Sequence, residues 1–211
     1  MANIYLTRHG RTFINELWRY LGSDEKKLLD SKYHRRLDRT ALNDLVQDEG
    51  ERAEFLSKVG LANANDFLVG ENLTEKGQMQ AVQLGIYLSS RNDVSGVVVP
   101  TKARLPIYRN NQTAKEIQAY LGRRLSSYPV DALTDTLGRY IPSDSSEIPE
   151  IVSQIAPLAG HVLVLNSGIL EGIVNHCGGD LEFFDNCGLV VLRPESGRLV
   201  IEQNYLSNEE L

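Results

Sequence analysis

The 211-residue sequence has only two cysteines, no long apolar run and no excess of basic residues. Cys177 and Cys187 form no CxxC pair and have no closely spaced histidine pair beside them. This suggests neither a disulfide framework nor a structural zinc site and favours two buried free thiols. No segment approaches the roughly 20 apolar residues that span a bilayer, and the first residues lack the basic start and apolar core of a secretory signal. We therefore expect a cytoplasmic protein without membrane contact.

The net charge is −6 at pH 7, so the chain as a whole repels polyanions. Nucleic-acid-binding proteins usually carry a basic face, and we therefore expect no nucleic-acid partner. Apolar residues make up 42% and charged residues 24% of the chain, which is typical of a globular protein. The length favours one domain over residues 1–211. An anionic ligand would have to be held by a local group of cationic side chains.

Short β-branched runs alternate with amphipathic segments along the chain. The expected strands are 3–7, 94–99, 161–165, 189–192 and 199–201, and the expected helices are 73–90, 112–121 and 169–174. This alternation predicts an α/β fold built from βαβ units. In such sheets ligands bind beyond the carboxyl ends of the strands, so the residues that follow Leu6, Val99 and Leu165 are expected to face one crevice.

Residues 13–72 differ from the rest of the chain, because charged clusters alternate there with short amphipathic stretches. We predict a helical insertion after the first strand. A packed cap over the crevice and a plain solvated excursion both stay open. The basic cluster of this segment also has two open interpretations, recognition of a second anionic group on a substrate or a solvated helix face. It consists of Lys32, Arg35, Arg36 and Arg39.

The first expected strand is followed directly by Arg8-His9-Gly10. Two further patterns come later in the chain, where residues 73–81 read LTEKGQMQA and residues 109–114 read RNNQTA. Together these three segments resemble the histidine phosphatase superfamily (phosphoglycerate mutase-like), in which Arg-His-Gly follows the first strand. The resemblance implies a three-layer α/β/α fold with a mostly parallel sheet and a phosphate pocket after the first strand.

The residue types in this pocket suit phosphoryl transfer. A transferring phosphoryl group spreads negative charge over three oxygens, and the guanidinium groups of Arg8 and Arg109 offer paired donors for them. Gly10 lets the backbone pass close to an anion. The resemblance adds Arg11 and Asn15 to the implied phosphate contacts.

His9 is the expected nucleophile, because a neutral imidazole can attack phosphorus near neutral pH and the phosphohistidine that forms is labile to water. This chemistry requires neither a metal nor another cofactor. The alternative interpretation of His9 is a core histidine whose ring is satisfied by backbone groups.

Departure of the leaving group needs a proton donor, and in the family a Glu after a Leu-x pair and ahead of a Gly supplies it. Asp135 stands at the matching place in residues 133–138 (LTDTLG), with a side chain shorter by one methylene. Glu147 is a second, weaker candidate. The alternative for Asp135 is a turn-forming aspartate in a polar loop.

The last family signature, Ser-His-Gly after a strand, reads Asn166-Ser167-Gly168 here. Ser167 stands in place of a histidine that donates to the phosphoryl oxygens, and the loss of one such donor commonly lowers the rate ~10²–10³-fold. Three explanations stay open: an engineered replacement, a natural degenerate member, or another group such as His176, His34 or an arginine of the insertion in the role of that histidine.

The resemblance therefore implies hydrolysis of a small phosphomonoester, with a small phosphorylated metabolite as partner and no cofactor. The alternative is a phospho-ligand-binding or repurposed member of the same fold that has lost turnover. The implied catalytic residues are His9, Asp135 and Ser167, and the implied phosphate-binding residues are Arg8, Arg11, Asn15, Arg109 and Gly168.

Overall fold

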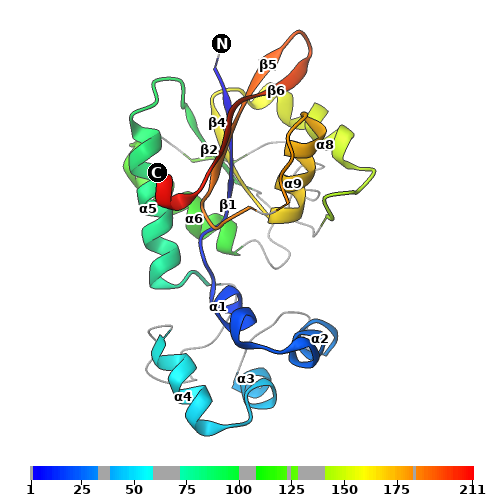
Figure 1. The fold of residues 1–211 in the computed structure, drawn as a ribbon. Coiled ribbons are helices and arrows are strands. Elements are labelled where there is room, and N and C mark those ends of the chain that lie inside the picture. The colour runs from blue at the N-terminus through cyan, green and yellow to red at the C-terminus, as the bar shows by residue number, and fades with distance from the viewer. Residues whose placement is uncertain are drawn as a thin grey trace. The chain divides into compact units, whose positions relative to one another are not determined.

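The computed structural model describes residues 2–32, 39–58, 72–99, 108–122, 125–127, 141–182 and 184–211. The chain forms two compact units, one comprising Met1–Gly10 and Gly77–Leu211 and the other Arg11–Lys76. Each unit has an apolar core of its own. Figure 1 shows a sheet with flanking helices in the first unit and short helices in the second.

The first unit is built on a six-stranded sheet with the order β3-β2-β4-β1-β5-β6. Its strands are β1 (Ile4–Arg8), β2 (Gly96–Val99), β3 (Leu125–Ser127), β4 (His161–Leu165), β5 (Leu189–Glu195) and β6 (Arg198–Leu206). β1 and β4, β2 and β4, and β2 and β3 run parallel, whereas β5 pairs antiparallel with both β1 and β6. The predicted mostly parallel sheet is confirmed.

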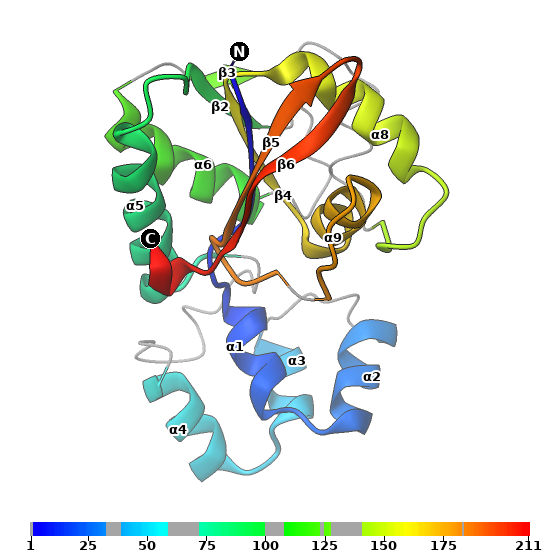
Figure 2. The ribbon, with the colours of Figure 1, turned by 45° about the horizontal axis from the view of Figure 1, so that its top comes forward.

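Helices cover both faces of this sheet (Figure 2). They are α5 (Glu75–Ser89), α6 (Tyr108–Leu121), α8 (Ile148–Ile155) and α9 (Ser167–His176), with 3-10 turns η2 (Ala156–Leu158) and η3 (Asn208–Glu210). Strand residues alternate between two cores, because successive side chains of a strand point to opposite faces. In β1, Tyr5 joins the core with α5 and α6, whereas Ile4 and Leu6 join the core with α8 and α9. The predicted three-layer α/β/α fold is therefore confirmed.

The described part of the second unit is helical. It contains α1 (Phe13–Tyr20), α2 (Ser23–Ser31), α3 (Arg39–Leu45) and α4 (Glu49–Lys58). Buried residues such as Leu17, Leu29 and Leu42 form its core. A capping box starts α1: Thr12 Oγ1 accepts from the Asn15 N–H at 3.3 Å, and Asn15 Oδ1 accepts from the Thr12 N–H at 3.1 Å.

The predicted role of this segment as a cap stays a prediction. In its basic cluster, exposed Lys32 pairs with Asp44 at 2.7 Å, which matches the solvated interpretation for that residue. Arg35 and Arg36 lie outside the described residues.

Two elements, β3 and α8, were not expected from the sequence. β3 has only three residues, too few for a β-branched run to stand out. The signal for α8 is present, because its buried residues Ile148, Ile151, Val152 and Ile155 follow a helical spacing. β5 and β6 are longer than expected and form a hairpin. Its turn places Ser196 at φ 51° and Gly197 at φ 84°, the left-handed pair that a two-residue hairpin loop uses.

Both cysteines are free. The expectation of two buried thiols is confirmed for Cys187 and wrong for Cys177, which follows the end of α9 and is only half-buried. Partial burial raises the pKa of Cys177 to about 11, which makes it a weak nucleophile at neutral pH. No described helix is long and apolar enough to cross a membrane.

Candidate active site

His9 lies just beyond β1, at the side of the sheet formed by the carboxyl ends of the parallel strands β1 and β4. Arg8 is in register with Leu165, and the His9 N–H donates to the Leu165 carbonyl at 3.4 Å. The residue is only 2% exposed. Its Nδ1 is 2.8 Å from the Gly10 carbonyl oxygen. Because a carbonyl can only accept, Nδ1 carries the ring hydrogen and Nε2 carries the lone pair.

Two arginines act on the charge of this imidazole. Arg8 ends β1, and its Nη1 donates to the Phe184 carbonyl at 2.7 Å. Arg109 lies in the first turn of α6, and its Nη2 donates to Asn166 Oδ1 at 3.0 Å. Burial, followed by the charges of Arg109 and Arg8, holds the pKa of His9 well below its usual range. The ring is therefore neutral at physiological pH, as a nucleophile must be.

The two guanidinium groups also act on each other. Burial, followed by the charge of Arg109, lowers the pKa of Arg8 to about 10. Like charges held together in a partly buried site are stabilised when an anion binds between or beside them. The site is therefore electrostatically suited to an oxyanion.

The three sequence motifs meet at Gly10. A Cβ on Gly10 would lie 2.4 Å from the Gly77 carbonyl oxygen, so the close approach of these two backbones requires a glycine. The Gly10 N–H donates to Thr113 Oγ1 at 2.9 Å, and the same hydroxyl donates to the Arg109 carbonyl at 2.8 Å. The glycine of the second motif and the threonine of the third thus both hold the residue after His9.

The start of α9 lies at the same edge, because β4 leads directly into this helix. Ser167 is its first residue and is half-buried. Gly168, which was predicted to bind phosphate, has a second reason to be glycine: a Cβ there would lie 2.4 Å from the Ile141 carbonyl oxygen. The first amides of a helix have no intrahelical acceptor and can serve an anion.

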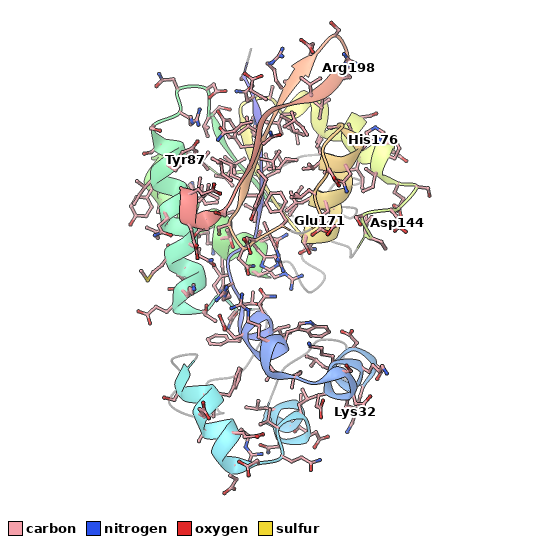
Figure 3. The ribbon with its side chains drawn as sticks, viewed as in Figure 1. Lys32, Tyr87, Asp144, Glu171, His176 and Arg198 are labelled. Atoms are coloured by element: carbon pink, nitrogen blue, oxygen red, sulfur yellow. The ribbon has the colours of Figure 1, made fainter. Side chains whose placement is uncertain are left out.

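His176 is too far from Ser167 to fill the role that the resemblance assigns to a histidine at that position. It is the last residue of α9, whereas Ser167 is the first. At 1.5 Å per residue the helix separates them by about 13 Å. Figure 3 shows His176 near one end of α9 and Glu171 nearer the other. His34 lies outside the described residues.

Residues 184–187 form part of the site and were missed by sequence reasoning. Asn186 Nδ2 donates to the His9 carbonyl at 2.9 Å, and the Cys187 N–H donates to the Arg8 carbonyl at 3.1 Å. With the Phe184 carbonyl on Arg8, this segment contacts both functional residues. Cys187 has a left-handed φ of 56°, an uncommon conformation for a residue with a side chain that often occurs at functional sites. No local pattern signals contacts between residues 177 positions apart.

Arg11 and Asn15 belong to the second unit, where Arg11 pairs with Glu16 at 3.1 Å and Asn15 caps α1. Their contribution to a phosphate site stays a prediction. Asp135 lies outside the described residues, and Glu147 is an exposed residue directly before α8. Across the described ranges, no group of three or more His, Cys, Asp or Glu side chains could hold a metal ion.

No family model matches the chain, and no curated protein matches its sequence. Solved structures do match its fold. The protein histidine phosphatase SixA, complexed with tungstate, superimposes with a TM-score of 0.54 and 14% identity over 98% of this chain and 97% of that one. A phosphoserine phosphatase of Entamoeba histolytica, in complex with 3-phosphoglyceric acid, gives 0.50 and 14% over 100% of both chains. The chain therefore has the phosphoglycerate mutase-like fold of the histidine phosphatases.

Proposed function

We propose that the chain hydrolyses a small phosphomonoester through a phosphohistidine on His9. The observation that carries this proposal is a fixed and neutral imidazole on which the charges of two arginines act. Nδ1 is held by the Gly10 carbonyl at 2.8 Å, while burial, Arg109 and Arg8 keep the ring deprotonated. The fold shared with phosphatases agrees with this chemistry.

The reaction would begin with attack of the His9 Nε2 lone pair on phosphorus. The bond between phosphorus and the ester oxygen breaks, and the leaving oxygen takes a proton from a general acid, for which Asp135 is the proposed donor. Arg8 and Arg109 would balance the charge on the phosphoryl oxygens. Water then attacks phosphorus and gives a proton to the Asp135 carboxylate, the P–N bond breaks, inorganic phosphate leaves, and neutral His9 and protonated Asp135 are restored.

Ser167 supports a second candidate, a protein that binds phosphorylated ligands and turns them over slowly or not at all. The described part of the chain contains two other histidines, and neither lies at the edge where β1 and β4 end. His161 is the first residue of β4 and therefore lies at the opposite end of that strand from Leu165, and His176 is the last residue of α9. If Ser167 takes the place of a transition-state donor, the expected loss is ~10²–10³-fold in rate.

Labelling with a radioactive phosphoryl donor tests the first proposal. We expect acid-labile label on the native chain and none on His9→Gln, while His176→Gln provides a matched control that keeps the label. Label on His9→Gln equal to that of the native chain would refute a His9 nucleophile. Hydrolysis of p-nitrophenyl phosphate by the native chain, lost in His9→Gln, would establish turnover.

Replacing Ser167 with histidine separates the two candidates. If the site is tuned for phosphoryl transfer, Ser167→His should raise the hydrolysis rate by orders of magnitude. Saturable binding of inorganic phosphate, with no hydrolysis in either form, would instead favour the binding protein. Loss of phosphate binding in Arg8→Ala would show that this arginine holds the ligand in both cases.

A further inference from the structure

Tyr205 is a half-buried residue of β6 that the proposed reaction does not use. The register between β5 and β6 shifts where it lies. Leu189 pairs with Leu206 and Val191 with Gln203, so β5 advances by two residues while β6 advances by three. The extra residue falls in the stretch of β6 that contains Tyr205, and such a bulge re-aims the side chains of the strand that carries it. This irregularity lets Tyr205 turn toward the residues that precede β5.

Tyr205 contacts three residues of the segment 184–188. Its hydroxyl accepts from the Asp185 N–H at 2.9 Å. Its ring packs edge-on against the fully buried ring of Phe184, with centroids 5.0 Å apart. A Cβ on Gly188 would lie 2.5 Å from Tyr205 Cε2, so the ring lies directly against the backbone there. Burial raises the pKa of Tyr205 to about 12, so the hydroxyl stays neutral at physiological pH. Tyr205 therefore contacts this segment near both of its ends.

The same segment contacts the end of β1, directly before the proposed nucleophile. The Phe184 carbonyl accepts from Arg8 Nη1 at 2.7 Å, and the Gly188 carbonyl accepts from Thr7 Oγ1 at 2.7 Å. Phe184 and Gly188 thus each contact both Tyr205 and β1.

An uncommon backbone conformation lies between these contacts. Cys187 has a left-handed φ of 56°, which costs free energy and persists only where surrounding contacts hold it. Asp185 and Gly188 lie on either side of Cys187, and Tyr205 contacts both. Tyr205 therefore helps to hold a backbone conformation that the segment would not favour by itself.

We propose that Tyr205 is a positioning residue, which holds residues 184–188 so that the Phe184 carbonyl keeps Arg8 in place for an incoming phosphoryl group. The inference rests on the proposed function of the His9 site. A long guanidinium side chain loses rotamer freedom when it binds an anion, so an acceptor that holds it beforehand improves binding. Tyr205 is not expected to touch the phosphoryl group, since its ring and hydroxyl contact this segment instead.

Two substitutions at Tyr205 separate the hydroxyl from the ring. Tyr205→Phe keeps the ring and removes the acceptor of the Asp185 N–H, whereas Tyr205→Leu also removes the aromatic contact. Because one hydrogen bond is lost, we expect Tyr205→Phe to raise the calorimetric Kd for inorganic phosphate by roughly three- to tenfold. Tyr205→Leu should raise it by more than about tenfold. Tyr120→Phe, at an exposed position of α6, is the matched control and should keep the native Kd.

A second measurement is independent of catalysis. Phenylglyoxal modifies arginine side chains, and peptide mass spectrometry reports the rate at Arg8. Exposed Arg198, at the hairpin end of β6 (Figure 3), provides the internal reference. Under conditions in which urea titrations show each variant to be folded, Tyr205→Phe should speed modification of Arg8 but not of Arg198. If the native chain neither binds phosphate nor labels His9, the proposed function fails, while the Arg8 rates still decide the role of Tyr205.

Three results would overturn the inference. One is a folded Tyr205→Phe chain whose Arg8 is modified at the native rate. Another is a native Kd for phosphate in both Tyr205 variants of a chain that binds phosphate. The third is an equal increase in the rates at Arg8 and Arg198, because a general loosening of the fold would then explain the effect.

Discussion

Replacing Thr113 with valine tests how the first and third sequence motifs are joined. The Thr113 hydroxyl accepts from the Gly10 N–H at 2.9 Å and donates to the Arg109 carbonyl at 2.8 Å, and the residue is fully buried. Valine has nearly the same shape as threonine but cannot accept a hydrogen bond. Thr113→Val therefore leaves the Gly10 N–H without this acceptor in a site that excludes water.

The expected loss of unfolding free energy follows from this one unpaired N–H group. A buried N–H that loses its partner costs about 1–3 kcal/mol of unfolding free energy. The Arg109 carbonyl loses less, because its position in α6 also provides a backbone partner. Gly10 carries the carbonyl that holds His9 Nδ1, so a shift of Gly10 misaligns the nucleophile. We expect phosphorylation of His9 to slow by on the order of tenfold or more.

Thr113→Ser is the matched control, because it keeps the hydroxyl and loses one methyl group. The lost methyl costs about 1 kcal/mol of stability, so both variants should unfold more easily in urea. Only Thr113→Val should slow the labelling of His9. Equal labelling rates in the two variants, or a Thr113→Val chain as stable as the native one, would refute the reasoning.

Three further perturbations follow from the same contacts. Gly10→Ala places a methyl group against the Gly77 backbone and should cost about 1–3 kcal/mol of unfolding free energy in thermal melts. Gly50→Ala, at an exposed position of α4, should change stability by under ~1 kcal/mol. Because folding lowers the pKa of His9, the unfolded chain alone takes up its proton below about pH 6.5. The stability of the native chain relative to His9→Gln should thus fall by up to about 1.4 kcal/mol from pH 6.5 to 5.5, and a pH-independent difference would contradict a buried neutral ring. Asn186→Ala removes the donor to the His9 carbonyl and should cost about 1–2 kcal/mol and slow labelling; unchanged labelling would exclude Asn186 from the site.

Much of the fold was predictable, because periodicity is a local property of the chain. The apolar run 161–165 predicted β4 at its observed bounds, and the helical pattern of 73–90 predicted α5 to within two residues. The pairing of β5 was not predictable in this way. A strand shows the same period-two pattern whether its neighbour is parallel or antiparallel, so nothing in residues 189–192 indicated the antiparallel contact with β1.

The residues of the candidate site also fall into those that the sequence predicted and those that it could not predict. Arg8, His9 and Arg109 could be named because their spacing resembles a family pattern, and the structure brings them together. Phe184 and Asn186 could not, because they act through a backbone carbonyl and an amide that meet the site only in the folded chain.

The antiparallel pairing of β5 with β1 has a consequence for the order in which the chain matures. β1, β2 and β4 all precede β5 in the chain, so a growing polypeptide carries His9 and both arginines before β5 has been made. Residues 184–187 reach Arg8 and His9 only when β5 docks beside β1, a closure over 177 residues for the Asn186 contact. Loop closure of this length is slow compared with local helix formation. Synthesis thus produces the parallel strands and both arginines first, and residues 184–187, which complete the site, become available only late in the chain.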